Sequence, residues 1–90
     1  MQIQDSNRKG KRFVAIFKDG TKIHFGQSNA FTYIDGADKA KRLAYLKRHN
    51  TGREDWSNPR SAGALSRWIL WGDFSNINGN IADFKRRFSL

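Results

Sequence analysis

Apolar and β-branched residues fill two short runs near the start of the chain, "RFVAIF" and "TKIHFG". Asp19 and Gly20 lie between them and predict a β-hairpin, because the favoured tight turns need residues that accept a positive φ. With these two residues as the loop, the predicted facing pairs are Lys18–Thr21, Ile16–Ile23 and Val14–Phe25. The second and third of these pairs define the predicted core face.

The other face of the hairpin carries Phe13, Ala15 and Phe17 beside Lys22 and His24. Two uses of this face are open. A helix can cover the two phenylalanines, or they can form a stacking platform with Lys22. Because an isolated two-stranded hairpin is only marginally stable in water, covering is favoured.

The first predicted helix runs through "GADKAKRLAYLKRHN", after a connection in which Ile34 is a candidate for a short third strand. Asp35 is the predicted N-cap, and the helix is expected to stop near Asn50 or Gly52. Its inward stripe is predicted to be Ala40, Leu43, Ala44 and Leu46–Lys47. Lys41, Tyr45 and Arg48 follow i, i+4, i+7 spacing on another face, which is therefore the leading candidate for a phosphate-contacting surface.

A second helix is predicted from Ser61 to Trp71, because its small and apolar residues recur at three- and four-residue spacing. Trp68 and Trp71 are interpreted as core anchors rather than as a platform for a ligand. Gly72 stands at the expected C-cap. Arg67 is expected to pair with Asp55 or Asp73.

A third helix is predicted by Ile77, Ile81, Phe84 and Phe88, which share one face and follow a cap at Ser75 or Asn76. The elements together predict an α+β fold, with an N-terminal hairpin packed against about three helices. Residues 12–90 are expected to form one domain. Residues 1–11, which have few large apolar side chains, are expected to be a flexible basic arm.

Charge is the strongest overall indication of function in the sequence. The chain has 17 Lys and Arg against 8 Asp and Glu, a formal net charge of +9. Such an excess favours polyanionic partners, which include nucleic acid and acidic proteins. The candidate nucleic-acid-binding residues are Arg8, Lys9, Lys11, Arg12, Lys41, Arg42, Tyr45, Arg48, Arg53, Lys85, Arg86 and Arg87.

Motifs for catalysis are missing. The chain has no cysteine, its two histidines fall on different predicted elements, and its acids stand mostly at caps and turns. No P-loop or nucleophile elbow is present, and "RHN" has only a superficial similarity to a histidine-dependent nuclease. The expectation is a non-enzymatic protein with no metal and no cofactor. A polar N-terminus and the lack of a long apolar run predict an intracellular location.

The chain resembles a family of small, basic, largely uncharacterised proteins of large nucleocytoplasmic DNA viruses and some phages. The resemblance covers roughly residues 12–90 and rests on "RHN", "REDW", "SAGALSRW", "LWGD" and "FKRRF". It implies a viral protein and narrows the predicted location to the host cytoplasm or nucleus or a virion, with packaging in the virion open. The family has no established activity, so the resemblance carries over no catalytic residues.

Two hypotheses follow, and a small nuclease ranks below both. In the first, the protein binds nucleic acid, in particular DNA, through phosphate contacts with little sequence readout, and Tyr45 or Phe13 stacks on exposed bases. In the second, it is a minor capsid or cement protein whose basic and aromatic surfaces bind coat proteins. Exposed tryptophans beside a flat apolar patch would favour the second. No membrane partner is expected, and the oligomeric state is open.

Overall fold

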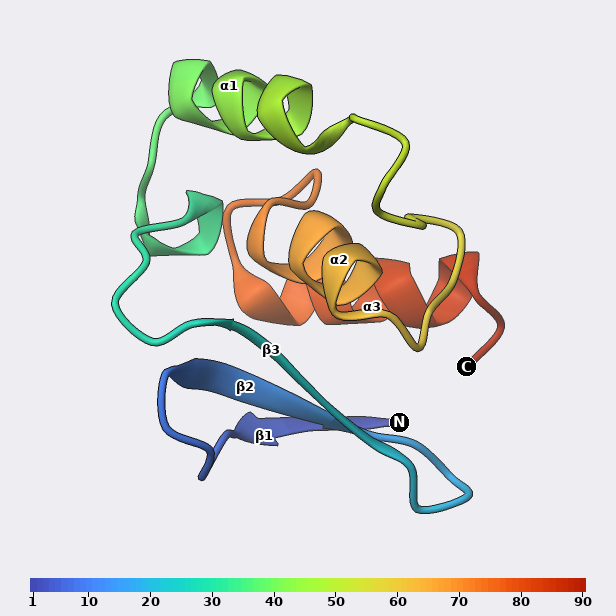
Figure 1. Cartoon of the computed structure of the whole chain (residues 1–90). Helices are drawn as coiled ribbons and strands as arrows, with labels where there is room; N and C mark the ends of the chain where they lie inside the picture. Colours follow the sequence, from blue (N-terminus) through green and yellow to red (C-terminus); the bar gives the residue numbers. More distant parts are fainter.

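The computed structural model describes residues 1–90 and has three layers (Figure 1). A three-stranded antiparallel sheet forms one layer, the α2, η2 and α3 helices form the middle layer, and α1 lies on the far side of that layer. The elements in chain order are β1 (Gln2–Asp5), β2 (Lys11–Ile16), β3 (Lys22–Gln27), the 3₁₀ turn η1 (Tyr33–Asp35), α1 (Lys39–His49), α2 (Ala62–Leu65), the π-helical turn η2 (Ser66–Leu70) and α3 (Ile77–Arg87). The predicted α+β class is confirmed.

The hairpin forms where Asp19–Gly20 predicts it, but the predicted register is wrong by one residue. Phe13 lies opposite Phe25, and Ala15 lies opposite Ile23. The cause is a longer loop, since Phe17 N–H donates to Thr21 O and Gly20 takes a positive φ of 88° after Asp19. Such a three-residue loop exchanges the two faces of β2 relative to a two-residue one.

The helix-covered face of β2 is therefore the one with Phe13, Ala15 and Phe17, all of which pack in or against the core. The expectation that helices cover the two phenylalanines is confirmed, whereas the assignment of Ile16 to the core face is wrong. His24 is half-buried on the outer face, where its Nδ1 lies 2.7 Å from Ser6 Oγ.

The third strand comes from the N-terminus, not from Ile34, which lies in η1. Within the expected arm, Gln2–Asp5 form β1 and pair with β2, with Ile3 opposite Ala15. Ile3 and Met1 both pack against the core, so the few apolar residues of this polar segment lie on the covered side of the sheet. The description of residues 1–11 as a flexible arm is thus wrong for this segment.

Helix α1 begins later than predicted, because Asp38 and not Asp35 is its N-cap and accepts from Lys41 N–H at 2.8 Å. Its buried face is also different. Tyr45 is buried, whereas Leu43, predicted to point inward, has 63% of its surface exposed. The inward stripe predicted for this helix is therefore wrong except at Leu46, which is half-buried and packs against the core.

The core lies between the sheet and the middle layer. Phe25 from β3, Leu65 from α2, Ile69 from η2 and Phe84 from α3 are all fully buried. Asn76 caps α3 as predicted, since its side chain accepts from Gly79 N–H at 2.7 Å. The predicted helix from Ser61 is confirmed as a short α-helix continued by a π-turn.

Gly72 is not a left-handed C-cap. The helical segment ends at Trp71, and Arg42 of α1 reaches across to this end, where its Nε donates to Gly72 O at 2.9 Å and to Trp71 O at 3.2 Å. Its Nη2 also pairs with Asp73 at 2.9 Å. Arg42 thus supplies donors to the two carbonyls that directly follow η2.

Asp35 joins the sheet to η1 through four hydrogen bonds. Arg12 of β2 donates to both carboxylate oxygens at 2.6 and 2.5 Å, and Thr32 donates from its N–H and its hydroxyl at 2.8 Å each. The Arg12 guanidinium, aided by Thr32, holds the pKa of Asp35 well below its ordinary value. This carboxylate is therefore a structural anchor.

We expect Asp35→Asn to lower the free energy of unfolding by about 1.5–3 kcal/mol at neutral pH, the range for hydrogen bonds to charged groups. A depressed folded-state pKa stabilises the protein fully above the unfolded pKa of about 3.9, and this stabilisation is lost as pH falls toward the folded pKa. Urea unfolding of both proteins should show their difference shrinking below about pH 4. A difference that stays constant into stronger acid would contradict this role for the Arg12–Asp35 pair.

Candidate functional site

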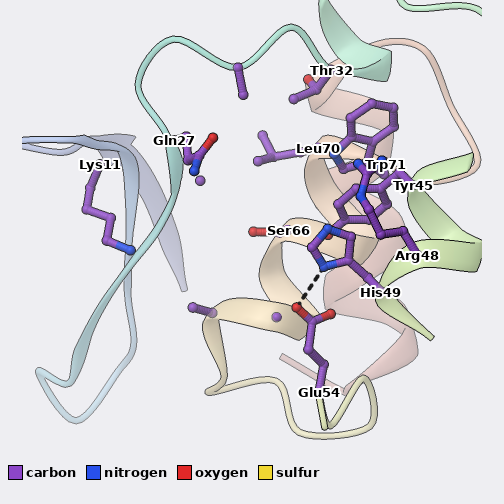
Figure 2. A pocket seen from close by; sticks show the side chains of 14 residues that line it. Lys11, Gln27, Thr32, Tyr45, Arg48, His49, Glu54, Ser66, Leu70 and Trp71 are labelled. Atoms are coloured by element: carbon purple, nitrogen blue, oxygen red, sulfur yellow. Dashed lines mark hydrogen bonds and ion pairs between the residues drawn. The ribbon is translucent and has the colours of Figure 1, made fainter. Parts of the chain in front are cut away.

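A cavity of about 430 Å³ opens at the side of the molecule where the sheet, α1 and α2 meet (Figure 2). One wall comes from the start of β2, the end of β3 and the loop that follows, and carries Lys11, Gln27 and Thr32. The other wall comes from the last turns of α1 and from α2 and η2. These two walls bring together residues that are distant in the sequence.

Three stacked rings line the helical wall. Tyr45 lies between His49 and Trp71, with ring centroids 4.3 and 4.5 Å away (Figure 2). Burial raises the pKa of Tyr45 well above its ordinary value. Because both ring faces are occupied, the expectation that Tyr45 stacks on exposed bases is wrong. Tyr45 instead forms part of the cavity wall.

Glu54 closes the lower end of the cavity and is held by two donors. His49 Nδ1 donates to its Oε1 at 3.0 Å, and Trp56 Nε1 donates to its Oε2 at 3.1 Å. Ser66 Oγ also lines the cavity, but it makes no hydrogen bond with His49. Ser66 and His49 are therefore not aligned as a nucleophile and its base, even though His49 pairs with Glu54.

Two cations lie on opposite walls of the cavity. Lys11 comes from the sheet side and Arg48 from α1 (Figure 2). Neither is in an ion pair, and neither side chain donates a hydrogen bond within the chain. The side chains of Gln27 and Ser66, which line the same cavity, also lack hydrogen-bond partners in the chain. The cavity therefore presents solvent-accessible donors and acceptors that have no partner in the chain, between two positive charges.

The other predicted nucleic-acid residues divide into two groups. Arg12 and Arg42 are held in the structural contacts described above, while Arg86 and Arg87 pair with the buried Asp83. The second group has no ion pair and consists of Arg8, Lys9, Lys41, Arg53 and Lys85, which are exposed except for the half-exposed Lys85. Lys41 Nζ lies 5.6 Å from the centre of the Phe31 ring. Of the predicted set, the structure brings together Lys11, Tyr45 and Arg48 around the cavity.

The sequence-based reasoning did not select four lining residues, Gln27, His49, Glu54 and Ser66. The short spacing of His49 and Glu54 was a usable signal, because a loop after the helix can bring the acid back to pair with the histidine. Gln27 and Ser66 carry no such signal, because only the packing of β3 against α2 brings them to one cavity.

The two tryptophans of the "SAGALSRW…LW" segment have different surroundings. Trp71 is buried in the ring stack. Trp68 is half-buried, and the guanidinium carbons of Arg67 and Arg87 lie 4.0 and 3.8 Å from its ring centroid. Burial lowers the pKa of Arg67. The expected ion pair of Arg67 with Asp55 or Asp73 is not formed, and its guanidinium instead donates to Trp71 O at 3.2 Å. The segment is structural in both halves.

No group of three or more histidine, aspartate or glutamate side chains lies close enough to hold a metal ion. None of the helices has the length and apolar character needed to cross a membrane.

Comparison with known proteins places the chain in a viral setting. The profile of a family of unknown function, DUF5754, matches residues 1–49, which includes the β1 segment outside the resemblance drawn from the sequence. "Uncharacterized protein L851" of Acanthamoeba polyphaga mimivirus is 41% identical over an alignment of 80 positions that covers 79% of this chain and 80% of that protein. No solved structure matches the chain. The chain therefore belongs to the DUF5754 family and has a relative in a giant DNA virus.

Proposed function

We propose that this protein binds nucleic acid through phosphate contacts with little sequence specificity. The observation that carries the proposal is the uncompensated positive charge. Every ion pair of a basic residue with Asp uses an arginine, and no lysine has a carboxylate within ion-pair distance. With most carboxylates used in ion pairs, caps or turns, the lysines together with Arg8, Arg48 and Arg53 are left for an external anion.

The surroundings of the tryptophans give no support to the alternative of a coat-protein contact. Trp71 is buried, and Trp56 and Trp68 are half-buried with Arg67 against both rings. The exposed tryptophans that would favour a minor capsid or cement role are therefore missing. That role remains the alternative, and weak DNA binding at physiological salt would favour it.

Salt dependence tests the mechanism, because each phosphate contact releases counterions. Fluorescence anisotropy of labelled DNA should show log K falling with log salt, by about 0.7 per contact on single strands and about 0.9 on duplexes. The double variant Lys11→Glu/Arg48→Glu should reduce the single-strand slope by about 1.4.

A matched control reverses the same number of charges elsewhere. Lys18→Glu/Lys22→Glu alters two unpaired lysines near the hairpin turn, away from the cavity. We expect a smaller loss of affinity for this pair than for the cavity pair. Equal losses would show that net charge alone governs binding, and the lack of any salt slope in the wild type would contradict phosphate binding.

A further inference from the structure

We propose that the cavity between the sheet and α1 takes the base of one unpaired nucleotide from a single strand. The inference rests on the proposed function and adds a specific binding mode to it. A volume of about 430 Å³ lies within the usual range of about 300–1,000 Å³ for small-ligand sites. It is far larger than a bare phosphate group requires, so phosphate contacts alone do not account for it.

The inner lining suits a flat group with apolar faces. Leu70 and Trp71 contribute apolar surface, and Gly26 and Gly63 line the cavity where other residues would carry a side chain. A β-carbon at Gly26 would lie 2.9 Å from Leu70 Cδ1, and one at Gly63 would lie 3.2 Å from Glu54 Cβ. Because neither position has a side chain, the sheet can pack closely against Leu70 at Gly26, and α2 can pack closely against Glu54 at Gly63. Neither position narrows the cavity.

Two lining groups suit the polar edge of a base. Gln27 and Ser66 come from opposite walls, and neither side chain has a partner in the chain (Figure 2). An amide and a hydroxyl can each donate and accept, so they can meet the edge of any base after a small rotation. This chemistry is consistent with binding that tolerates many sequences.

The charges suit the phosphates on either side of an inserted base. Lys11 and Arg48 stand on opposite walls, so a strand that enters the cavity passes between two cations. The one lining acid, Glu54, is hydrogen-bonded by His49 and Trp56, and these donors offset its repulsion of an anion. A base in a duplex is stacked and paired, so entry should require an unpaired nucleotide.

The test compares two labelled chains of the same length and charge: an oligothymidylate and an abasic deoxyribose–phosphate polymer. We expect the full protein to bind the oligothymidylate about tenfold or more tightly, because contacts with the inserted base add to the phosphate contacts that both chains make. Ala62→Phe places a ring at the cavity from an exposed position and should remove this preference. Ala82→Phe, at an exposed site on α3, is the matched control and should keep it.

The outcomes separate the two proposals. Equal, salt-dependent binding of both chains would leave the phosphate mechanism intact and overturn the cavity proposal. A preference for bases that survives Ala62→Phe in a folded variant, as judged by circular dichroism, would also overturn it. Binding of neither chain would overturn the proposed function itself.

Discussion

Replacing Gly72 by alanine is expected to lower the free energy of unfolding by about 3 kcal/mol or more, since no small shift can make room for one methyl group. Gly72 is buried between η2 and α3. A β-carbon there would lie 2.2 Å from the backbone oxygen of Trp68 and 2.6 Å from Asn80 Oδ1. The first of these atoms belongs to the main chain of the π-turn, so relief of the clash requires the turn to move away from α3.

Gly20→Ala is the control, because a β-carbon at Gly20 meets nothing within 4 Å while its φ is +88°. It isolates the cost of a left-handed conformation, about 1–2 kcal/mol. In thermal unfolding, Gly72→Ala should lower Tm by more than 10 °C, at about 4–8 °C per kcal/mol for a domain of this size. A Tm loss no greater than that of Gly20→Ala would show that η2 and α3 are not packed as described.

Asn80→Leu is the second substitution with a large expected effect, about 3–5 kcal/mol of destabilisation. Asn80 on α3 is fully buried, and its amide nitrogen donates to Ile69 O at 2.9 Å and to Phe74 O at 2.8 Å. Its Oδ1 accepts from Phe74 N–H at 2.9 Å. Leucine has a similar volume but leaves the buried Ile69 O and two part-buried main-chain groups of Phe74 without these partners, and a buried polar group left without one costs about 1–3 kcal/mol.

Urea unfolding measures this loss directly. Asn78→Leu makes the same change at an exposed position two residues earlier on α3, and it should change stability by no more than about 0.5 kcal/mol. If the two variants were equally stable, Asn80 would not be the residue that joins α3 to the loop after η2.

The sheet shows how far local pattern carries a prediction. The Asp19–Gly20 pair located the hairpin correctly, but not whether Gly20 belongs to a two- or a three-residue loop. Because side chains alternate between faces, that one-residue difference placed Phe13 and Phe17 on the same face of the sheet as Ile23 and Phe25, which is the core face. Hydrophobicity did not decide between the two, since both faces of β2 carry apolar residues.

Helix α1 shows a second limit. Its periodicity predicted the helix but oriented it incorrectly, with Leu43 inward and Tyr45 outward. In the structure, Tyr45 is inward, where its ring stacks on Trp71, and Leu43 is exposed. Such pairing between elements 26 positions apart is a tertiary property, as is the convergence of Lys11 and Arg48 on one cavity.

A titration of ¹⁵N-labelled protein with a short single-stranded oligonucleotide tests the central claim most directly, because each backbone amide reports on its own surroundings. We predict that the largest chemical-shift changes occur at Lys11, Gln27, Arg48 and Ser66, which surround the cavity. Gln2 and Ala82, in β1 and on the exposed side of α3, should change little. Shifts confined to residues outside the cavity walls, or none at all at low salt, would contradict the account.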